Sequence, residues 1–381
     1  MTPQKLTGFH KFVCFVLIAI LVILVIGFAV NGTKTDDNLP GSGDVGNKTD
    51  DTDENSNEND TQNNGQAPDN NESDDPSTLP PEIETVIYYN PITGLEVSEE
   101  VYNSTPIATV LDPTAPLYGA AESDLVIEFP TETDSSRLLV YNSSEEVLWK
   151  IGALSPTRNF ISSMSNFFGG IIVSYGEDDV VIYDAWDYEA FFIDISKYKD
   201  CCYVENTLYV YTSENMIDLA KSKAGQDQLK RAYKSAPYDF LDDGEVLGTG
   251  EVSTVMIPFS ESNETELYYH EKTGQYLYYK SGNRKMDMLS GKNVGFTNVF
   301  ILFANSTTYE KSEGRELVID TLSGGKGYYI SAGKYIEFKW ETDVSGDLYF
   351  LTLNGERLKV NPGNAYISYV KSSNAGSVKI I

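Results

Sequence analysis

Hydrophobic positions divide the chain into three stretches of different character. Residues 12–30 form an unbroken apolar run, and residues 31–81 contain almost no large apolar side chain. From residue 86 onward, short apolar clusters alternate with turn-forming residues. The third stretch has the pattern of a folded region, because strands and helices that cover a core recur between polar turns.

Between residues 86 and 242 the clusters predict strands mixed with helices. One helix is indicated at 157–168, before a Gly-Gly stop, and another from a cap at Ser213 to about Tyr233. Short β-branched or aromatic clusters predict strands at 106–111, 124–128, 137–141 and 171–175. The first half is therefore expected to hold a mixed sheet and helices.

Beyond residue 246 the pattern changes to strands and turns. Apolar clusters flank the turn sequences 271–274, 332–333 and 354–355. Asn354 followed by Gly355 is the strongest of these signals, because both residue types accept the positive φ angles of a type I′ turn. The second half is expected to be rich in antiparallel hairpins, and the folded region as a whole is expected to be α+β.

The apolar run at residues 12–30 is long enough to cross a bilayer. Its 19 residues would extend about 28 Å as a helix, close to the thickness of the hydrocarbon core. Lys5 and Lys11 precede the run and acidic residues follow it, which places residues 1–11 in the cytoplasm and the C-terminal region outside the cell. We expect a single-pass membrane protein; a signal peptide cleaved after the small residues at 27–29 is the alternative.

Residues 31–81 are predicted to be a disordered acidic linker. They are mainly polar and acidic, and such a segment cannot bury enough apolar surface to offset the entropy lost on ordering. A flexible coil of about 50 residues spans roughly 40 Å. The linker would hold the folded region away from the membrane.

Charge and cysteine content narrow the possible partners. The chain has 57 acidic and 28 basic residues and a formal net charge of -29. It is therefore not expected to bind nucleic acid, which requires a basic surface. Cys14, Cys201 and Cys202 cannot build a disulfide framework. The adjacent pair is expected to be reduced, with a strained vicinal disulfide as the alternative.

Several motifs follow one another in a definite order from residue 86 to about 372. In the first half they are Asn90-Pro91-Ile92-Thr93-Gly94-Leu95, residues 123–128, and Glu132 followed by Arg137; in the second half they are 276–287, 298–301, 324–340 and 361–363. In this order they resemble the YerB-like envelope lipoproteins, a bacterial family with two adjoining domains of unknown function. The resemblance implies domains at 86–242 and 246–376, a layered α+β sandwich and an envelope location, but no established activity.

Two stretches depart from the family pattern. Residues 152–158 contain a single arginine, Arg158, where the family commonly has two, and a histidine common before the stretch matched by 209–213 is absent. A membrane helix also stands in place of the family's lipid anchor. A ligand shared by the family would therefore be lost or bound differently here.

Charged positions matched by the resemblance form the predicted ligand site, Glu128, Arg137 and Arg158. Arginines are scarce in this acidic region, and a guanidinium group can bind a carboxylate or phosphate through two hydrogen bonds. The alternative is a structural ion pair of these arginines with Glu128 or Glu132.

Three consecutive acids, Glu177, Asp178 and Asp179, are the candidate metal ligands. They follow the predicted strand 171–175, and ligands often bind beyond the carboxyl ends of strands. Clustered carboxylates suit Ca²⁺ or Mg²⁺, although they also fit a solvated loop. No cofactor is expected.

Motifs typical of catalysis are missing, so a non-catalytic role is favoured and enzymatic activity is left open. The chain has two histidines, His10 and His270, and no nucleophile elbow precedes a helix. Trp340 suits either a sugar-stacking platform or the core.

We expect a membrane-anchored extracellular protein that binds an envelope protein or a cell-wall polymer. The alternative is a carbohydrate- or peptidoglycan-active enzyme, with carboxylates drawn from Glu128, Glu132, Asp178, Asp179 and Asp184.

Overall fold

The computed structural model describes residues 86–381 except 134, 145, 163, 177–190, 228, 243–246 and 312–313. The predicted anchor at 12–30, the linker at 31–81 and the candidate metal ligands at 177–179 lie outside the described residues. Pro81–Ile381 forms one compact unit. Across the described part of this unit, no helix has both the length and the apolar character needed to cross a membrane.

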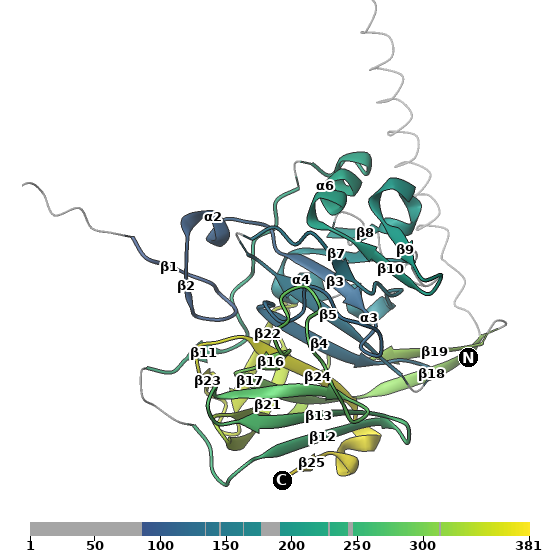
Figure 1. The fold of residues 1–381 in the computed structure, drawn as a ribbon. Helices are drawn as coiled ribbons and strands as arrows, with labels where there is room; N and C mark the ends of the chain where they lie inside the picture. The colour runs from purple at the N-terminus through teal and green to yellow at the C-terminus, as the bar shows by residue number, and fades with distance from the viewer. Residues whose placement is uncertain are drawn as a thin grey trace, which may run out of the picture. The chain divides into compact units, whose positions relative to one another are not determined.

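Strands from both halves of the chain form one ten-stranded mixed sheet (Figure 1). In spatial order they are β22 (Leu348–Thr352), β21 (Lys334–Thr342), β20 (Gly325–Ser331), β17 (Asn298–Ala304), β24 (Ala365–Lys371), β4 (Leu125–Pro130), β5 (Ser136–Asn142), β3 (Ile107–Leu111), β7 (Ile171–Ser174) and β8 (Phe192–Asp194). The halves join where β24 pairs in parallel with β4, so that Ala365 lies opposite Leu125. The two predicted domains are therefore connected by a continuous sheet.

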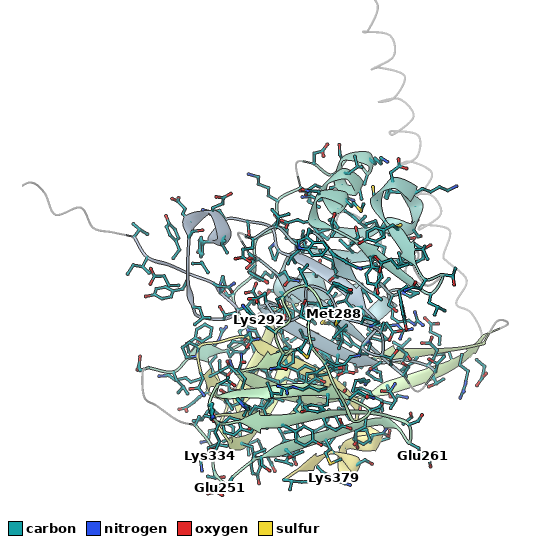
Figure 2. All side chains as sticks on the ribbon, in the orientation of Figure 1. Glu251, Glu261, Met288, Lys292, Lys334 and Lys379 are labelled. Atoms are coloured by element: carbon teal, nitrogen blue, oxygen red, sulfur yellow. The ribbon has the colours of Figure 1, made fainter. Side chains whose placement is uncertain are left out.

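A second, six-stranded antiparallel sheet belongs to the second half of the chain. Its strands are β15 (Asn283–Arg284), β14 (Gln275–Lys280), β13 (Asn263–His270), β12 (Thr254–Ser260) and β25 (Lys379–Ile380), with β16 (Gly295–Phe296) also paired to β14. Figure 2 shows Glu251, Glu261 and Lys379 at the outer margin of this layer. Their charged side chains lie on the side of the molecule that water can reach.

The remaining elements are short. The smaller sheets consist of β1 (Tyr88–Tyr89) with β2 (Glu96–Val97); β6 (Ile151–Gly152), β10 (Tyr209–Thr212) and β9 (Tyr203–Glu205); β11 (Asp239–Phe240) with β23 (Lys359–Val360); and β18 (Ser306–Lys311) with β19 (Gly314–Ile319). The α-helices are α2 (Glu99–Tyr102), α3 (Asn159–Ser162), α4 (Met164–Phe168) and α6 (Glu214–Lys223). The 3₁₀ helices are η2 (Ile195–Lys197), η3 (Lys199–Cys201) and η4 (Ser372–Ser377).

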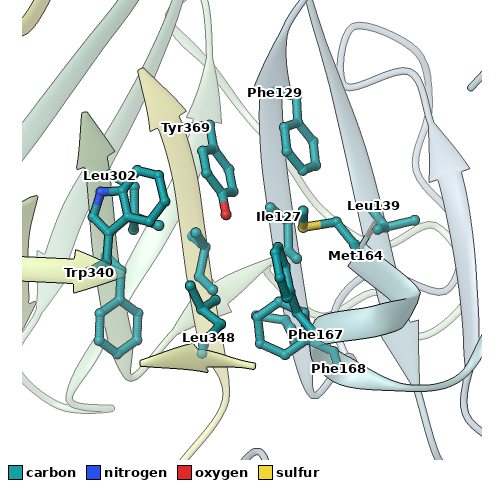
Figure 3. Packing of buried hydrophobic residues seen from close by; sticks show 14 of the residues in the cluster. Ile127, Phe129, Leu139, Met164, Phe167, Phe168, Leu302, Trp340, Leu348 and Tyr369 are labelled. Carbon is teal, nitrogen blue, oxygen red and sulfur yellow. The ribbon is translucent and has the colours of Figure 1, made fainter. Parts of the chain in front are cut away.

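The ten-stranded sheet is covered on both faces, which makes the fold a layered sandwich. Alternate residues of a strand point to opposite faces, and Ile127 of β4 packs with α3 and α4, whereas Val126 packs with β12 to β14 and α6. Figure 3 shows the first of these cores, where Met164 and Phe168 of α4 lie against Ile127 and Leu139. The expected α+β class with a mixed sheet is confirmed.

Most of the predicted strands are present, with small shifts at their ends. Strands predicted at 106–111, 124–128, 137–141 and 171–175 correspond to β3, β4, β5 and β7. The predicted hairpins around 271–274 and 332–333 are β13–β14 and β20–β21. Alternation of apolar residues was sufficient for these elements, because each buries at least one face.

Both predicted helices are shorter than expected. The segment 157–168 begins its helix at Asn159, because the Thr157 N–H donates to the Gly176 carbonyl and holds the preceding chain against β7. The helix after Ser213 ends at Lys223 instead of continuing to Tyr233. Gly225 has a φ of +71°, and beyond it the Arg231 N–H donates to Thr105 Oγ1. Tertiary hydrogen bonds thus replace the last helical turns.

The strongest predicted hairpin turn does not have the expected geometry. A type I′ turn needs positive φ at both central residues, but at 354–355 this holds for Gly355 alone, with a φ of +89°. The flanking segments still pair antiparallel through a bridge between Leu351 and Arg357, and the chain then forms β23, which pairs with β11. Among the predicted hairpin turns, the one at 332–333 has two positive φ angles, +49° at Ala332 and +71° at Gly333.

Candidate functional site

Two of the three predicted ligand residues, Arg137 and Arg158, lie near one edge of the ten-stranded sheet. β3 and β7 run parallel, and β4 runs in the same direction because β3 and β4 are both antiparallel to β5. Their carboxyl ends therefore share one edge, where Glu132 follows β4 and Asp112 follows β3. Arg137 is the second residue of β5 and lies at this edge. Arg158 directly precedes α3. This edge corresponds to the usual ligand side of sheets with parallel strands.

Arg158 and Glu132 form a bidentate ion pair at this edge. Arg158 Nε lies 2.9 Å from Glu132 Oε2, and its Nη2 donates to Oε1. The side chains are 14% and 15% exposed, so the pair is shielded from water. Burial opposes the charge of Glu132, but hydrogen bonds from Arg158 outweigh it and lower the pKa of Glu132. The predicted alternative of an internal ion pair is thus present for Arg158.

Arg137 lies beside this pair and has an incomplete set of partners. Its Nη1 donates to the Ser136 carbonyl at 2.9 Å, and its Nε is buried without a hydrogen-bond partner among the described residues. Burial lowers the pKa of Arg137; Asp112 and Glu132 counteract this effect, whereas Arg158 adds to it. An arginine remains protonated under all ordinary conditions, so the lowered pKa marks a charge that its surroundings only partly compensate.

Glu128 lies away from the two arginines, on the other face of the sheet. Its register partner on β5 is Leu138, whereas Arg137 lies opposite Phe129. Glu128 is completely buried between the two large sheets. Lys280 Nζ and Ser136 Oγ donate to its Oε1 at 2.8 and 2.5 Å, and the hydroxyl groups of Thr265, Tyr278 and Tyr366 donate to its Oε2 at 2.9, 3.2 and 2.5 Å. These five donors leave Glu128 enclosed by protein.

The other candidate residues have ordinary surroundings where they are described. Trp340 is buried in the core, with its ring 5.9 Å from that of Tyr369, so its core role is confirmed (Figure 3). His270 lies exposed at the end of β13, and its Nδ1 is 3.0 Å from Thr273 Oγ1. Cys201 and Cys202 are free thiols, as expected.

Carboxylates show no catalytic or metal-binding arrangement in the described part of the chain. Of the acids considered for glycoside hydrolysis, Asp178, Asp179 and Asp184 lie outside the described residues, while Glu128 and Glu132 are engaged as above. No group of three His, Cys, Asp or Glu side chains suited to a metal occurs among the described residues. The predicted metal site at Glu177, Asp178 and Asp179 stays a prediction.

A groove at the opposite, amino edge of the sheet was not predicted from the sequence. It has a volume of about 850 Å³ and is lined by parts of α2 and α6 and by the first residues of β3 and β7. A smaller cavity of about 70 Å³ shares Ser104, Thr105, Ile107 and Glu214 with it. The lining residues come from separate segments between 98 and 230, and each segment has an ordinary composition. No local sequence motif therefore indicates the groove.

Comparison with known families finds a match in the second half of the chain. Residues 255–367 match the C-terminal domain of a protein family of unknown function, DUF3048. This match supports the predicted resemblance to the YerB-like DUF3048 family. The matched domain covers most of the six-stranded sheet and the strands from β17 to β24.

The fold of this chain is similar to that of a solved protein. The crystal structure of the YerB protein from Bacillus subtilis superimposes with a TM-score of 0.67 at 24% identity, over 77% of this chain and 99% of that one. This likeness establishes the fold. No curated protein matches the sequence of this chain at a significant level.

Proposed function

We propose that this chain is a membrane-anchored, non-catalytic binding protein of the cell envelope. It would hold an anionic group of an envelope protein or a wall polymer at the carboxyl edge of the ten-stranded sheet. The observation that carries this proposal is the buried Arg137 Nε, which has no hydrogen-bond partner among the described residues. Buried polar groups in native proteins are almost always paired, so an unpaired one suggests a missing partner.

Charges at the edge favour an anion as that partner. Glu132 neutralises Arg158 through two hydrogen bonds. Asp112 is near Arg137, but its Oδ1 already accepts from the N–H and the hydroxyl group of Thr114 at 2.9 and 2.7 Å. A carboxylate or phosphate bridging Nε and Nη2 of Arg137 would form the bidentate geometry that guanidinium groups prefer.

The roles of the predicted residues then differ. Arg137 would contact the ligand, and Arg158 would be a positioning residue whose pair with Glu132 keeps that carboxylate from neutralising Arg137. Glu128 would stabilise the fold from the other face. The strongly acidic chain repels polyanions at long range, so a single carboxylate or phosphate group fits better than a continuous phosphate surface.

Location outside the cell rests on the sequence. The apolar run at residues 12–30 and the lysines before it support a membrane anchor with the folded region outside. The acidic linker supports a spacer that would carry the binding region into the cell wall.

The Arg137 Nε–H resonance allows a direct NMR test. Inorganic phosphate and acetate are titrated into the protein, and a saturable shift of this resonance is expected. Arg137→Gln should abolish anion binding while the melting temperature stays near that of the wild type. Arg284→Gln, at an exposed position on β15, is the matched control and should leave anion binding unchanged.

Arg158→Ala separates binding from structure. This variant should melt at a lower temperature, because Glu132 loses its partner in a shielded position. Unchanged anion binding in Arg137→Gln would contradict the proposal. A large loss of melting temperature in Arg137→Gln, with anion binding kept by the folded fraction, would show that Arg137 serves the fold.

A further inference from the structure

We propose that the groove at the amino edge binds a basic polypeptide segment, with one lysine-type ammonium group seated in the smaller cavity beside Asn142. This site is separate from the arginine edge, because the two lie at opposite ends of the same strands. It therefore stands independently of the anion-binding proposal.

The groove is open and carries an excess of negative charge. Five carboxylates line it against two lysines, and one of these, Lys221, is already bound to Asp218 at 3.1 Å. The acids come from three segments, represented by Glu100 of α2, Asp218 of α6 and Asp227 beyond α6. A concave surface lined by one sign of charge concentrates ligands of the opposite sign. The acidic chain as a whole adds to this attraction for cations.

The smaller cavity contains a buried acceptor without a donor. Asn142 is 7% exposed, and its Nδ2 donates to the Gly119 carbonyl at 3.2 Å. Asn142 lines the smaller cavity, and its Oδ1 is buried without a hydrogen-bond partner among the described residues. Leaving a buried carbonyl oxygen unpaired is unfavourable, so a donor from outside the chain is expected here.

The surroundings of Asn142 distinguish an ammonium group from a neutral donor. Glu146 and Glu214 line the same cavity, and Glu214 Oε2 accepts one bond, from the Leu148 N–H at 3.0 Å. An ammonium group has three donors and no acceptor. It can therefore bond to Asn142 Oδ1 while its charge is balanced by both glutamates. A water molecule would satisfy Asn142 but would leave the two carboxylates uncompensated.

Apolar residues in the lining favour a polypeptide over a free polyamine. Ile107 and Ile171 line the groove where it meets the smaller cavity, and Leu229 lies further along it. A lysine side chain buries its methylene stem against apolar surface while its charged end binds polar groups. The groove itself, with a volume of about 850 Å³, holds several neighbouring residues of the same peptide.

A capped hexalysine peptide is a suitable probe, measured by fluorescence anisotropy at low salt against the full folded chain. The groove variant Glu100→Gln/Asp218→Asn/Asp227→Asn should weaken peptide binding at least tenfold. The matched control Glu337→Gln/Glu341→Gln/Glu356→Gln removes three exposed acids outside the groove and should change the Kd less than twofold. Equal weakening by the two triple variants would overturn the proposal, because it would indicate attraction by net charge alone.

The seat is tested at its exposed rim, where a substitution does not disturb the core. Ser144 is exposed and lines the smaller cavity, so Ser144→Lys brings an ammonium group of the chain itself to the seat. Peptide binding should fall about fivefold or more, whereas Ser373→Lys, at another exposed serine, should have little effect. Equal effects of the two lysine variants would refute the seat.

Competition with a free polyamine tests whether the ligand is a polypeptide. Spermidine should compete with the peptide only weakly, because it lacks the neighbouring residues that fill the groove. Competition by spermidine at the concentration of the peptide's own Kd would overturn the assignment to a polypeptide. Asn142→Asp should tighten peptide binding by adding charge at the seat, and an unchanged Kd in a correctly folded variant would indicate that water alone occupies it.

Discussion

At the scale of single residues, the described chain uses its buried charges in two different ways. Glu128 and Lys280 are 0% and 1% exposed and compensate each other inside the sandwich, together with four hydroxyl donors to Glu128. Arg137 has no such partner set at the edge of the sheet. The first arrangement stabilises the fold, whereas the second leaves hydrogen-bonding capacity for a ligand.

Removing Lys280 tests the structural role of the enclosed pair. Lys280→Met should lower the free energy of unfolding by about 3–5 kcal/mol, because Glu128 would remain buried and charged without its counter-ion. The double variant Glu128→Gln/Lys280→Met should be more stable than Lys280→Met alone, since no unpaired charge is left. Denaturant unfolding of the three proteins measures this. A double variant no more stable than Lys280→Met would contradict the enclosed-pair account.

The same pair predicts a dependence of stability on pH. Burial opposes the charge of Glu128, yet Lys280 and the hydroxyl donors lower its pKa, and the pKa of Glu132 is lowered as well. A carboxylate with a lowered folded-state pKa stabilises the protein above its unfolded value, about 4.3, and this contribution is lost as pH falls through the folded value. Unfolding free energies should therefore fall steeply below about pH 4. The Glu128→Gln/Lys280→Met variant should show a shallower fall; equal slopes would count against the assignment.

At the scale of elements, close approach between strands explains positions that a hydrophobic pattern cannot. β20 lies between β17 and β21 and contains Gly325 and Gly327. A Cβ atom at Gly327 would lie 2.3 Å from the Ile301 carbonyl oxygen and 2.7 Å from the Phe338 ring. The glycine is required by its neighbours and not by its own backbone, since its φ is not positive.

Gly327→Ala should therefore weaken the sandwich. Because the obstructing atom belongs to the backbone of a paired strand, the added methyl group must displace β17 or β20, and we expect a loss of about 1–3 kcal/mol in unfolding free energy. Gly376→Ala is the matched control, since a Cβ atom there meets nothing within 4 Å and the φ is not positive. Thermal and denaturant unfolding compare the two variants. Similar stabilities would show that β20 adapts without cost.

At the scale of the whole molecule, the two halves depend on each other. The ten-stranded sheet continues from β24 of the second half to β4 of the first, and the Glu128–Lys280 pair joins a first-half strand to a second-half strand. The six-stranded sheet covers one face of strands from both halves. We expect residues 86–381 to fold and unfold as one unit.

Membrane topology is predicted from residues 1–81. A protease added to intact cells should cut within the polar linker and release the folded region, because the linker has no apolar face with which to pack. Immunodetection of the released C-terminal part measures this. Protection of the region in intact cells would contradict an outside location. A mature protein that begins near Val30 would show instead that the apolar segment is cleaved.

The candidate sites were predictable to different degrees. The short motifs around Glu132, Arg137 and Arg158 pointed to the arginine edge, and the structure brings these three together. The same motifs included Glu128, whose side chain lies on the other face because successive strand residues alternate. Its partner Lys280 is 152 residues away in the chain. No local pattern identifies such a partner, since the contact depends on which strands become neighbours.

The sequence by itself determined the strand-rich α+β class, the positions of several strands and the hairpins around 271–274 and 332–333, whereas the parallel pairing of β24 with β17 was not expected. These properties follow from short-range alternation of apolar and polar residues, which every segment carries. The tertiary structure alone decided where the helices end, that one sheet unites the halves, and that scattered acids and Asn142 meet in a groove. These depend on pairing between segments far apart in the chain, where hydrogen bonds and packing outweigh local propensity.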